Sequence, residues 1–149
     1  KIFKFRTMVM NADKMGPLVT QDNDSRITKI GKKIRSFRLD EVPQLINVLI
    51  GDMSFVGTRP EVQKYVDAYS EEMMVTLLLP AGITSKSSIK FRNEADKISK
   101  WMEQGLTADE AYIQKILPEK MQYNIDYIEE VSVTQDIKVM LQTVFAVLR

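Results

Sequence analysis

The side chains best suited to chemistry in this chain are two adjacent carboxylates, Asp40 and Glu41, and an arginine further along, Arg59. The two acids stand at the start of a helical pattern, where unpaired N–H groups and aligned peptide dipoles favour ionised, oriented carboxylates. An oriented carboxylate can act as a nucleophile, and the planar fork of an arginine suits bidentate contact with phosphate. These residues therefore indicate a site that handles phosphate. The alternative is that Asp40 only caps a helix and Glu41 is a favourable first-turn acid.

The segment that must position these acids is predicted to be a helix over residues 40–50. Pro43 is compatible with this helix because proline is tolerated in a first turn, and Gly51 supplies a C-terminal stop. The apolar residues recur at i, i+3, i+4 and i+7 and form one face of an amphipathic helix: Val42, Leu45, Ile46 and Leu49.

The segment after this helix carries Arg59. Residues 53–56 are predicted to be extended, and Gly57 to form a turn. Because Pro60 disfavours helical geometry at the preceding residue, Arg59 is presented from a stiff, non-helical segment. The alternative for Arg59 is a structural salt bridge to a carboxylate.

A positive patch precedes the dyad. Six basic residues and no acid lie between positions 26 and 38: Arg26, Lys29, Lys32, Lys33, Arg35 and Arg38. The rest of the chain holds 15 basic and 20 acidic residues, so the near-neutral total conceals a patch that implies an anionic partner. Apolar residues at three- and four-residue steps predict a basic amphipathic helix that brings Arg35 and Arg38 within reach of Asp40. The three lysines are interpreted as solvated surface charge.

The composition indicates one globular domain over residues 1–149, with 44% hydrophobic residues. The expected fold is α+β and mostly helical, with short strands and several amphipathic helices. The chain has no cysteine and no histidine, which excludes disulfides, thiolate ligands and imidazole catalysis. No apolar run approaches the roughly 20 residues that span a bilayer, and no signal peptide is visible.

The flanking elements are predicted from alternation and capping signals. Near the start, Phe3, Phe5 and Thr7 alternate with Lys4 and Arg6, which predicts a strand whose cations either join the phosphate site or face water. The expected loose stretches are residues 11–24 and 81–96.

Three helices are predicted towards the C-terminus. Thr107 and Glu110 form a capping box that opens one helix, and Pro118 opens another that runs to about Tyr127. The last helix is predicted from about Asp136, with an apolar stripe that either packs in the core or lies in a lipid interface. The stripe comprises Ile137, Met140, Leu141, Val144, Phe145 and Leu148.

The segment around the dyad resembles the signature of the bacterial sugar transferases. These are monotopic phosphoglycosyl transferases, which move a sugar-1-phosphate from a nucleotide sugar onto a polyprenyl phosphate. The resemblance covers nearly the whole chain and is specific as an ordered set of motifs, at residues 3–8, 24–31, 39–61, 80–84 and 135–138.

The chain departs from the family pattern in two respects. Thr58 stands where members usually carry a proline, so the loop before Arg59 loses one rigid residue. The chain also begins with Lys1 and has no hydrophobic re-entrant segment, so we expect a fragment of a longer membrane-associated protein.

The resemblance implies a covalent transfer reaction. It makes Asp40 the nucleophile that attacks the sugar-bearing phosphorus of a UDP-sugar and expels UMP, after which polyprenyl (undecaprenyl) phosphate accepts the phosphosugar. Glu41 resembles the family's Mg²⁺-binding acid. Arg35 and Arg59 match positions that hold phosphate oxygens, and Arg6 and Arg38 are assigned to the same phosphate-binding group. Supporting positions are Gln44, Asn47, Pro60, Thr84 and Asp136, the last of which is alternatively the cap of the final helix.

By the same resemblance, the protein acts at the cytoplasmic face of the bacterial inner membrane, in the first membrane step of polysaccharide or glycoconjugate synthesis. The sugar, the lipid chain length and the oligomeric state are not specified by any of these motifs.

Two other functions stay open at this point. A basic helix followed by a second helix is compatible with a helix-turn-helix nucleic-acid-binding module, although Asp40 and Glu41 would repel a DNA backbone. The chain is alternatively an inactive relic of the transferase that keeps the motifs without the activity.

Overall fold

The computed structural model describes residues 1–20 and 24–148, apart from the side chain of Leu148. The predicted mostly helical α+β fold is confirmed. The helices are α1 (Lys29–Ser36), α2 (Gln44–Leu49), α3 (Gln63–Val66), α4 (Glu71–Met74), α5 (Lys86–Lys90), α6 (Glu94–Met102), α7 (Ala108–Ala111), α8 (Leu117–Glu129) and α9 (Val133–Leu148). Shorter 3₁₀ segments are η1 (Ala12–Lys14), η2 (Leu39–Glu41) and η3 (Val75–Leu77), and a π-helical turn, η4, spans Tyr112–Ile116.

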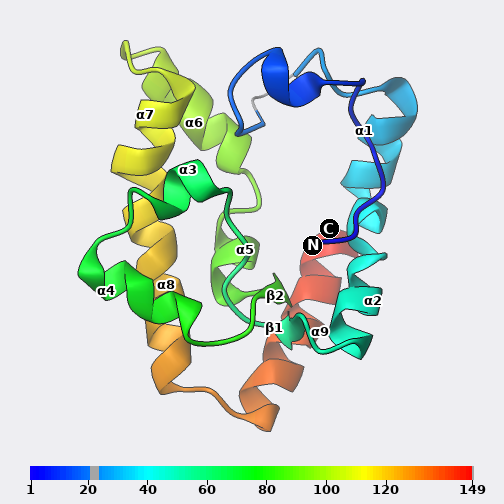
Figure 1. Cartoon of the computed structure of the whole chain (residues 1–149), viewed down its shortest axis with the longest axis vertical. Helices are drawn as coiled ribbons and strands as arrows, with labels where there is room; N and C mark the ends of the chain where they lie inside the picture. The colour runs from blue at the N-terminus through cyan, green and yellow to red at the C-terminus, as the bar shows by residue number, and fades with distance from the viewer. Residues whose placement is uncertain (21–23, 149) are drawn as a thin grey trace.

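A two-stranded parallel pair lies at the centre of the molecule, between two groups of helices (Figure 1). Strand β1 (Ser54–Val56) pairs with β2 (Gly82–Thr84), with Ser54 opposite Gly82. The extended segment predicted at residues 53–56 is therefore confirmed. The strands approach closely because Gly57 and Gly82 lack side chains: a Cβ on Gly82 would lie 2.2 Å from the Gly57 nitrogen.

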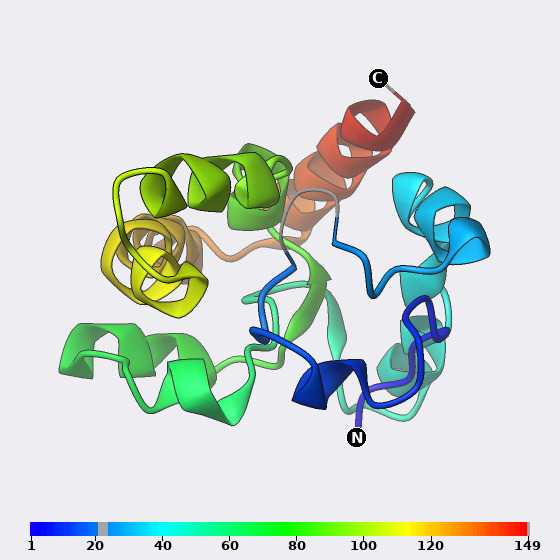
Figure 2. The ribbon, with the colours of Figure 1, turned by 90° about the horizontal axis from the view of Figure 1, so that it is seen from above.

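The two groups of helices lie on opposite sides of this pair. Helices α1 and α2 form one side, and α3, α4, α6, α7 and α8 form the other (Figure 2). Helix α9 packs against the strand pair and contacts both strands. No helix in the described part of the chain is long and apolar enough to cross a membrane.

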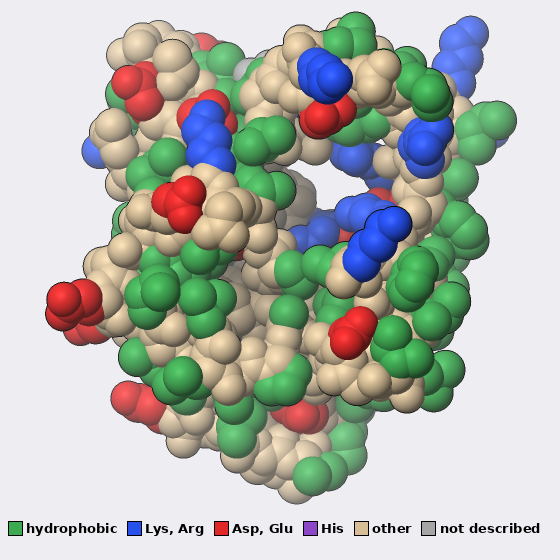
Figure 3. All heavy atoms as spheres, in the orientation of Figure 1, with side chains coloured by type: hydrophobic (Ala, Val, Ile, Leu, Met, Phe, Trp, Pro, Cys, Tyr) green, Lys and Arg blue, Asp and Glu red, His purple; other side chains and the backbone are tan. Residues whose placement is uncertain are grey.

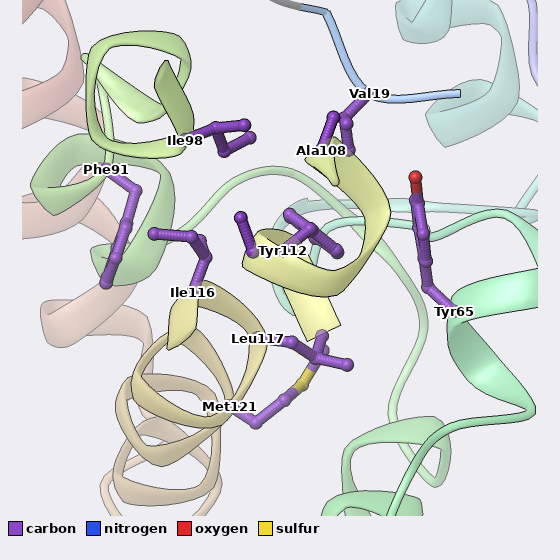
Figure 4. Packing of buried hydrophobic residues seen from close by; sticks show 10 residues of the cluster. Val19, Tyr65, Phe91, Ile98, Ala108, Tyr112, Ile116, Leu117 and Met121 are labelled. Carbon is purple, nitrogen blue, oxygen red and sulfur yellow. The ribbon is translucent and has the colours of Figure 1, made fainter. Parts of the chain in front are cut away.

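The main core lies within the second group, around η4. Ile98, Tyr112, Ile116, Leu117 and Met121 are almost fully buried there and pack against one another (Figure 4). A smaller cluster of Val56, Tyr127 and Val139 joins β1, α8 and α9.

Capping signals explain where several helices begin. The predicted capping box is confirmed: Thr107 accepts from the Glu110 N–H, and Glu110 accepts from the Thr107 N–H. Pro118 stands in the first turn of α8, as predicted, where α8 follows the π-helical turn η4 without a break. Thr28 caps α1 by accepting from the Gly31 N–H at 2.9 Å, so the predicted basic helix is present over a shorter range.

Three predictions about the flanking elements are wrong. Residues 3–7 form no strand, because the Phe5 N–H donates to the Asp40 carbonyl at 3.0 Å and ties this segment to the dyad instead. Residues 81–96 are not loose: they contain β2, α5 and the start of α6, and Ser85 caps α5 by accepting from the Ser88 N–H.

The last helix also differs from its prediction, since α9 begins at Val133 rather than at Asp136. The Asp136 N–H donates to the Ser132 carbonyl at 2.9 Å, so Asp136 lies inside the first turn and is not the cap. Its apolar stripe is only partly packed: Met140 contacts the smaller core cluster, whereas Ile137, Leu141, Val144 and Phe145 are exposed. The side chain of Leu148 lies outside the described residues.

Candidate active site

The dyad lies on a tight 3₁₀ turn, η2, and not on the predicted helix over residues 40–50. Arg38 adopts a left-handed conformation with φ of 56° at the N-cap of this turn, between α1 and the dyad. Pro43 then caps α2, so the α-helix begins only at Gln44. Because the acids precede the α-helix, side-chain contacts orient them more than the helix dipole does.

Asp40 is almost fully buried, with 3% of its surface exposed. Its Oδ2 atom lies 3.2 Å from the Lys4 Nζ atom. Its Oδ1 atom is buried and has no hydrogen-bond partner. Buried carboxylate oxygens are nearly always hydrogen-bonded, so an unpartnered Oδ1 is the kind of exception expected where chemistry occurs.

Glu41 is surrounded by three cations. Its Oε1 atom accepts a hydrogen bond from Arg59 and lies 3.2 Å from Lys4 Nζ and 3.9 Å from Arg38 Nη1. Burial alone would raise the pKa of this carboxyl, but these cations, Arg59 foremost, lower the pKa to about 2. Glu41 is therefore ionised throughout the physiological pH range.

A polar cavity of about 490 Å³, here called the polar cavity, opens beside the dyad. Its lining includes both acids and most of the basic side chains around them, and Figure 3 shows basic side chains gathered at a hollow between the two groups of helices. The opposite wall includes Asn93, Glu94 and Lys120. The cavity therefore combines a carboxylate pair with a surplus of positive charge, which suits a phosphorylated ligand.

Arg35 is held in this cavity by neutral hydroxyl groups. Its Nε atom donates to Thr7 Oγ1 at 2.8 Å and its Nη1 atom to Thr20 Oγ1 at 3.2 Å. Burial lowers the pKa of Arg35, although the nearby charge of Asp40 opposes that effect. Arg35 is thus fixed in position without an ion pair to any described carboxylate, which leaves its charge available to an anionic ligand.

A second, apolar hollow of about 230 Å³, here called the apolar groove, lies between α2, β2, α5 and α9. Its apolar lining is formed by Val42, Leu45, Ile83, Ile89, Ala146 and Val147. Glu41, Arg38, Arg59 and Arg92 line both the apolar groove and the polar cavity. The two hollows therefore meet at the dyad and its arginines.

The structure brings together five of the six residues proposed for catalysis and phosphate binding: Asp40, Glu41, Arg35, Arg38 and Arg59. Arg6 is not among them. Its Nη1 atom donates to Met10 Sδ at 2.9 Å, and its exposed side chain lines neither hollow.

The supporting residues have separate positions. Asn47 is fully buried and holds the N-terminal segment, because its Oδ1 accepts from the Phe3 N–H and its Nδ2 donates to the Lys1 carbonyl. Gln44 is buried on the same face of α2. Thr84 lines the apolar groove and bonds to Thr143 at 2.7 Å.

Two other supporting residues line neither hollow. Pro60 follows Arg59 in the chain, and Asp136 accepts a hydrogen bond from the Tyr127 hydroxyl. The geometry thus places Asp136 in a contact between α9 and α8.

Only some of the cations that reach the site were predicted from the sequence. Lys4, which was predicted either to join the phosphate site or to face water, contacts both acids of the dyad. Arg26, counted in the positive patch, is instead buried and bound to Asp24 and to backbone carbonyls. Glu61, Glu94 and Lys120 were missed, because they come from three segments with no common motif. Lys29, Lys32 and Lys33 are exposed, as predicted.

The donor set is compatible with Mg²⁺ held jointly by protein and substrate. Among the described residues, Lys4, Arg38 and Arg59 contact the Glu41 carboxylate at Oε1, and the Asp40 Oδ1 atom has no hydrogen-bond partner. Among the described residues no group of three or more acids forms a cage for a metal ion. Mg²⁺ is usually bound through one or two carboxylates together with substrate phosphates, so two carboxylates are sufficient.

Comparison with known proteins gives a consistent family. Residues 1–149 match the bacterial sugar transferase family. The chain is 33% identical over 151 residues to the UDP-N-acetylgalactosamine-undecaprenyl-phosphate N-acetylgalactosaminephosphotransferase of Aeromonas hydrophila, covering 99% of this chain and 32% of that protein. It is 37% identical over 150 residues to the UDP-glucose:undecaprenyl-phosphate glucose-1-phosphate transferase of Escherichia coli K12, covering 97% and 29%.

A protein of the same name from Caulobacter vibrioides is 33% identical over 147 residues, covering 97% of this chain and 49% of that protein. The chain therefore spans between about a third and a half of the length of these relatives.

Proposed function

Because this chain belongs to the bacterial sugar transferase family, we propose that it transfers a sugar-1-phosphate from a UDP-sugar to undecaprenyl phosphate through a covalent intermediate on Asp40. One observation carries this proposal: the polar cavity and the apolar groove share Glu41, Arg38 and Arg59 on their common wall. A donor that is polar throughout and an acceptor with a long apolar tail can thus meet at one phosphate site.

In the first step, Asp40 attacks the sugar-bearing phosphorus of the UDP-sugar. The bond between that phosphorus and the bridging oxygen breaks, UMP leaves with the electron pair, and a phosphosugar stays attached to the carboxylate. The unpartnered Oδ1 atom supports this role, since no hydrogen bond has to be broken before it reacts. Arg35 and Arg59 offset the charge that would otherwise repel a carboxylate from a pyrophosphate.

In the second step, an oxygen of undecaprenyl phosphate attacks the same phosphorus. The bond to Asp40 breaks, the carboxylate is regenerated and a lipid-linked sugar pyrophosphate leaves. The apolar groove is suited to the first isoprene units of the acceptor, whose phosphate would then lie at Arg38, Arg59 and Arg92.

Glu41 is the residue we assign to Mg²⁺, with Asp40 beside it. When bound, the ion would neutralise phosphate oxygens and so weaken the repulsion between donor and dyad. Glu41 itself anchors Arg59 by a hydrogen bond and holds that guanidinium at the common wall.

We also assign the exposed apolar residues near the groove to contact with the cytoplasmic surface of the bacterial inner membrane. In α2, Leu45, Ile46 and Leu49 are exposed, and in α9 so are Val144 and Phe145. Figure 3 shows hydrophobic side chains gathered on the side of the molecule formed by α2. An apolar surface beside the groove would let a lipid acceptor enter without leaving the membrane.

The names of the relatives supply the donors to test first, namely UDP-N-acetylgalactosamine and UDP-glucose. Each is incubated with the protein and Mg²⁺, and the products are followed by intact-protein mass spectrometry and by UMP release. We expect a mass increase of one phosphosugar in the wild type and in Asp52→Asn, an exposed-aspartate control. Asp40→Asn should show no increase.

An adduct that persists in Asp40→Asn would refute the nucleophile. No adduct and no UMP from any donor in the wild type would identify the chain as an inactive relic. Full activity in excess chelator would remove Mg²⁺ from the proposal.

A further inference from the structure

We propose that Lys120 is a positioning residue for Arg59. Lys120 is bound to Glu61, Glu94 and Tyr112, which together are here called the Lys120 network, and Lys120 and Glu94 line the polar cavity. The inference rests on the proposed function for its kinetic test, but not for its binding test.

The contacts of Lys120 are short and converge on one atom. Its side chain is almost fully buried, and its Nζ atom lies 3.0 Å from Glu61 Oε1, 2.9 Å from Glu94 Oε2 and 2.7 Å from the Tyr112 hydroxyl. The Tyr112 hydroxyl in turn donates to Glu61 Oε1 at 2.5 Å. Burial and the Glu61 charge raise the pKa of Tyr112, so this hydroxyl stays protonated.

Three oxygen atoms lie within 3.0 Å of the Lys120 Nζ atom. A lysine ammonium offers three N–H donors, and three acceptors surround this one. Lys120 lines the polar cavity, but its ammonium already has two hydrogen bonds and an ion pair with Glu94, with which a substrate phosphate would have to compete. Its role in the site is therefore to hold other groups in place.

The π-helical turn η4 brings Lys120 to Tyr112. The two residues are eight positions apart, and in an uninterrupted α-helix they would diverge by about 80°. A π turn accommodates one additional residue, which restores a spacing close to two full turns and places both side chains on one face. The Nζ atom consequently lies 4.8 Å from the centre of the Tyr112 ring.

The network acts on Arg59 through the chain between them. Residues 57–62, here called the Arg59 loop, contain no helix or strand. Arg59 is bound to Glu41 on one side of the polar cavity, whereas Glu61, two residues later, is bound to Lys120 and Tyr112 on the other. The loop is thus fixed at both of these residues, with the stiff Pro60 between them.

Loss of Lys120 would change this balance of charge. Glu61 and Glu94 would stay half-buried beside each other without their common cation. Both acids also interact electrostatically with Arg59. Arg59 would then be drawn towards them and away from Glu41, where the phosphate is expected.

A double-mutant cycle tests this positioning role. The variants are Lys120→Met, Arg59→Lys and the double variant, measured by kcat and KM for the UDP-sugar and by calorimetric binding of UDP. We expect each single change to lower kcat/KM and to weaken UDP binding by about tenfold, and the double variant to be only slightly worse than Arg59→Lys. A residue that only stabilises the fold would give independent, multiplying effects.

Lys64→Met is the matched control. Lys64 pairs with Asp109 at 2.5 Å, and Asp109 also accepts from the Tyr65 hydroxyl, but this lysine lines neither hollow. We expect it to change kcat/KM less than twofold or so, and to act independently of Arg59.

Should Lys120→Met fail to fold, Glu61→Gln replaces it, because the amide keeps the shape of the side chain while breaking the ion pair. The inference would be overturned if the effect of changing Lys120, or Glu61 in its place, were independent of the effect of changing Arg59. It would also be overturned if Lys120→Met changed kcat/KM and UDP binding as little as Lys64→Met. A wild type without adduct would refute the transferase function alone, and the UDP-binding cycle would still decide the role of Lys120.

Discussion

Titration of Glu41 gives a quantitative test of the charge arrangement at the dyad. Its carboxyl has a pKa of about 2 in the folded protein, compared with 4.5 for an unperturbed glutamate. The unfolded chain therefore binds more protons between these values, so the free energy of unfolding falls as the pH falls from 4.5 towards 2. Since one pKa unit corresponds to about 1.4 kcal/mol, Glu41 contributes about 3 kcal/mol that is present above pH 4.5 and lost near pH 2. Only 9% of its side chain is exposed, so solvent screening reduces this figure little.

The measurement is urea unfolding of the wild type and of Glu41→Gln at several pH values from 6 to 2. Glutamine cannot titrate, so other groups cancel in the difference between the two proteins. We expect the difference in free energy of unfolding to change by about 3 kcal/mol across the range. The wild type should lose stability relative to Glu41→Gln as the pH falls. Glu130→Gln removes an exposed ion pair with Lys86 and should differ from the wild type by less than about 1 kcal/mol.

A difference between wild type and Glu41→Gln that stays constant from pH 6 to pH 2 would refute the reasoning. It would show that Arg59, Lys4 and Arg38 do not hold the ionised carboxylate in the folded protein. The assignment of Arg59 to the common wall of the two hollows would then lose its physical basis.

Three further predictions concern single substitutions. Arg59→Lys keeps the charge but loses the planar fork, so kcat/KM for the UDP-sugar should fall at least about tenfold, and unchanged turnover would make this residue peripheral. Arg26→Met leaves the buried Asp24 carboxylate without its arginine and should lower the free energy of unfolding by about 3–5 kcal/mol in urea titrations, whereas a neutral effect would contradict the buried pair. Gly82→Ala places a Cβ against the backbone of Gly57 and should lower the free energy of unfolding by about 1–3 kcal/mol, and an unaltered melting temperature would show that the strands are farther apart.

Local signals in the sequence were the ones that predicted structure well. The capping box at Thr107, the first-turn Pro118 and the extended segment before Gly57 each depend on a few neighbouring residues. The ordered motifs around the dyad also predicted the family, which the family match over residues 1–149 confirms.

Features that depend on distant parts of the chain were not predictable in the same way. Residues 3–7 have the alternation of a strand, but their backbone groups bond to Asp40, Asn47 and Thr28, and the neighbouring Met8 forms an isolated bridge with Ile27 instead of a ladder. Lys120 and Glu61 meet only because a π turn and a loop bring them together. No spacing in the sequence encodes either contact.

Helix α2 illustrates why an amphipathic pattern alone does not identify the buried face. Its polar residues Gln44 and Asn47 are buried, whereas Leu45 and Ile46, and Val42 just before the helix, are exposed. Asn47 can be buried because its side-chain amide forms hydrogen bonds with backbone groups of the N-terminal segment. This segment also brings Lys4 to the dyad.

The exposed face of α2 has no such partner in the described residues, yet Val42 and Leu45 form one wall of the apolar groove that ends at Glu41. Burying the polar face of α2 thus supports the proposed phosphate site, while the exposed apolar face leaves a surface next to it that we propose for the lipid acceptor. If the acceptor enters along this surface, Leu45→Asp should raise the KM for undecaprenyl phosphate without changing the rate of adduct formation from the UDP-sugar. An equal loss in both half-reactions would instead place Leu45 in the support of the dyad.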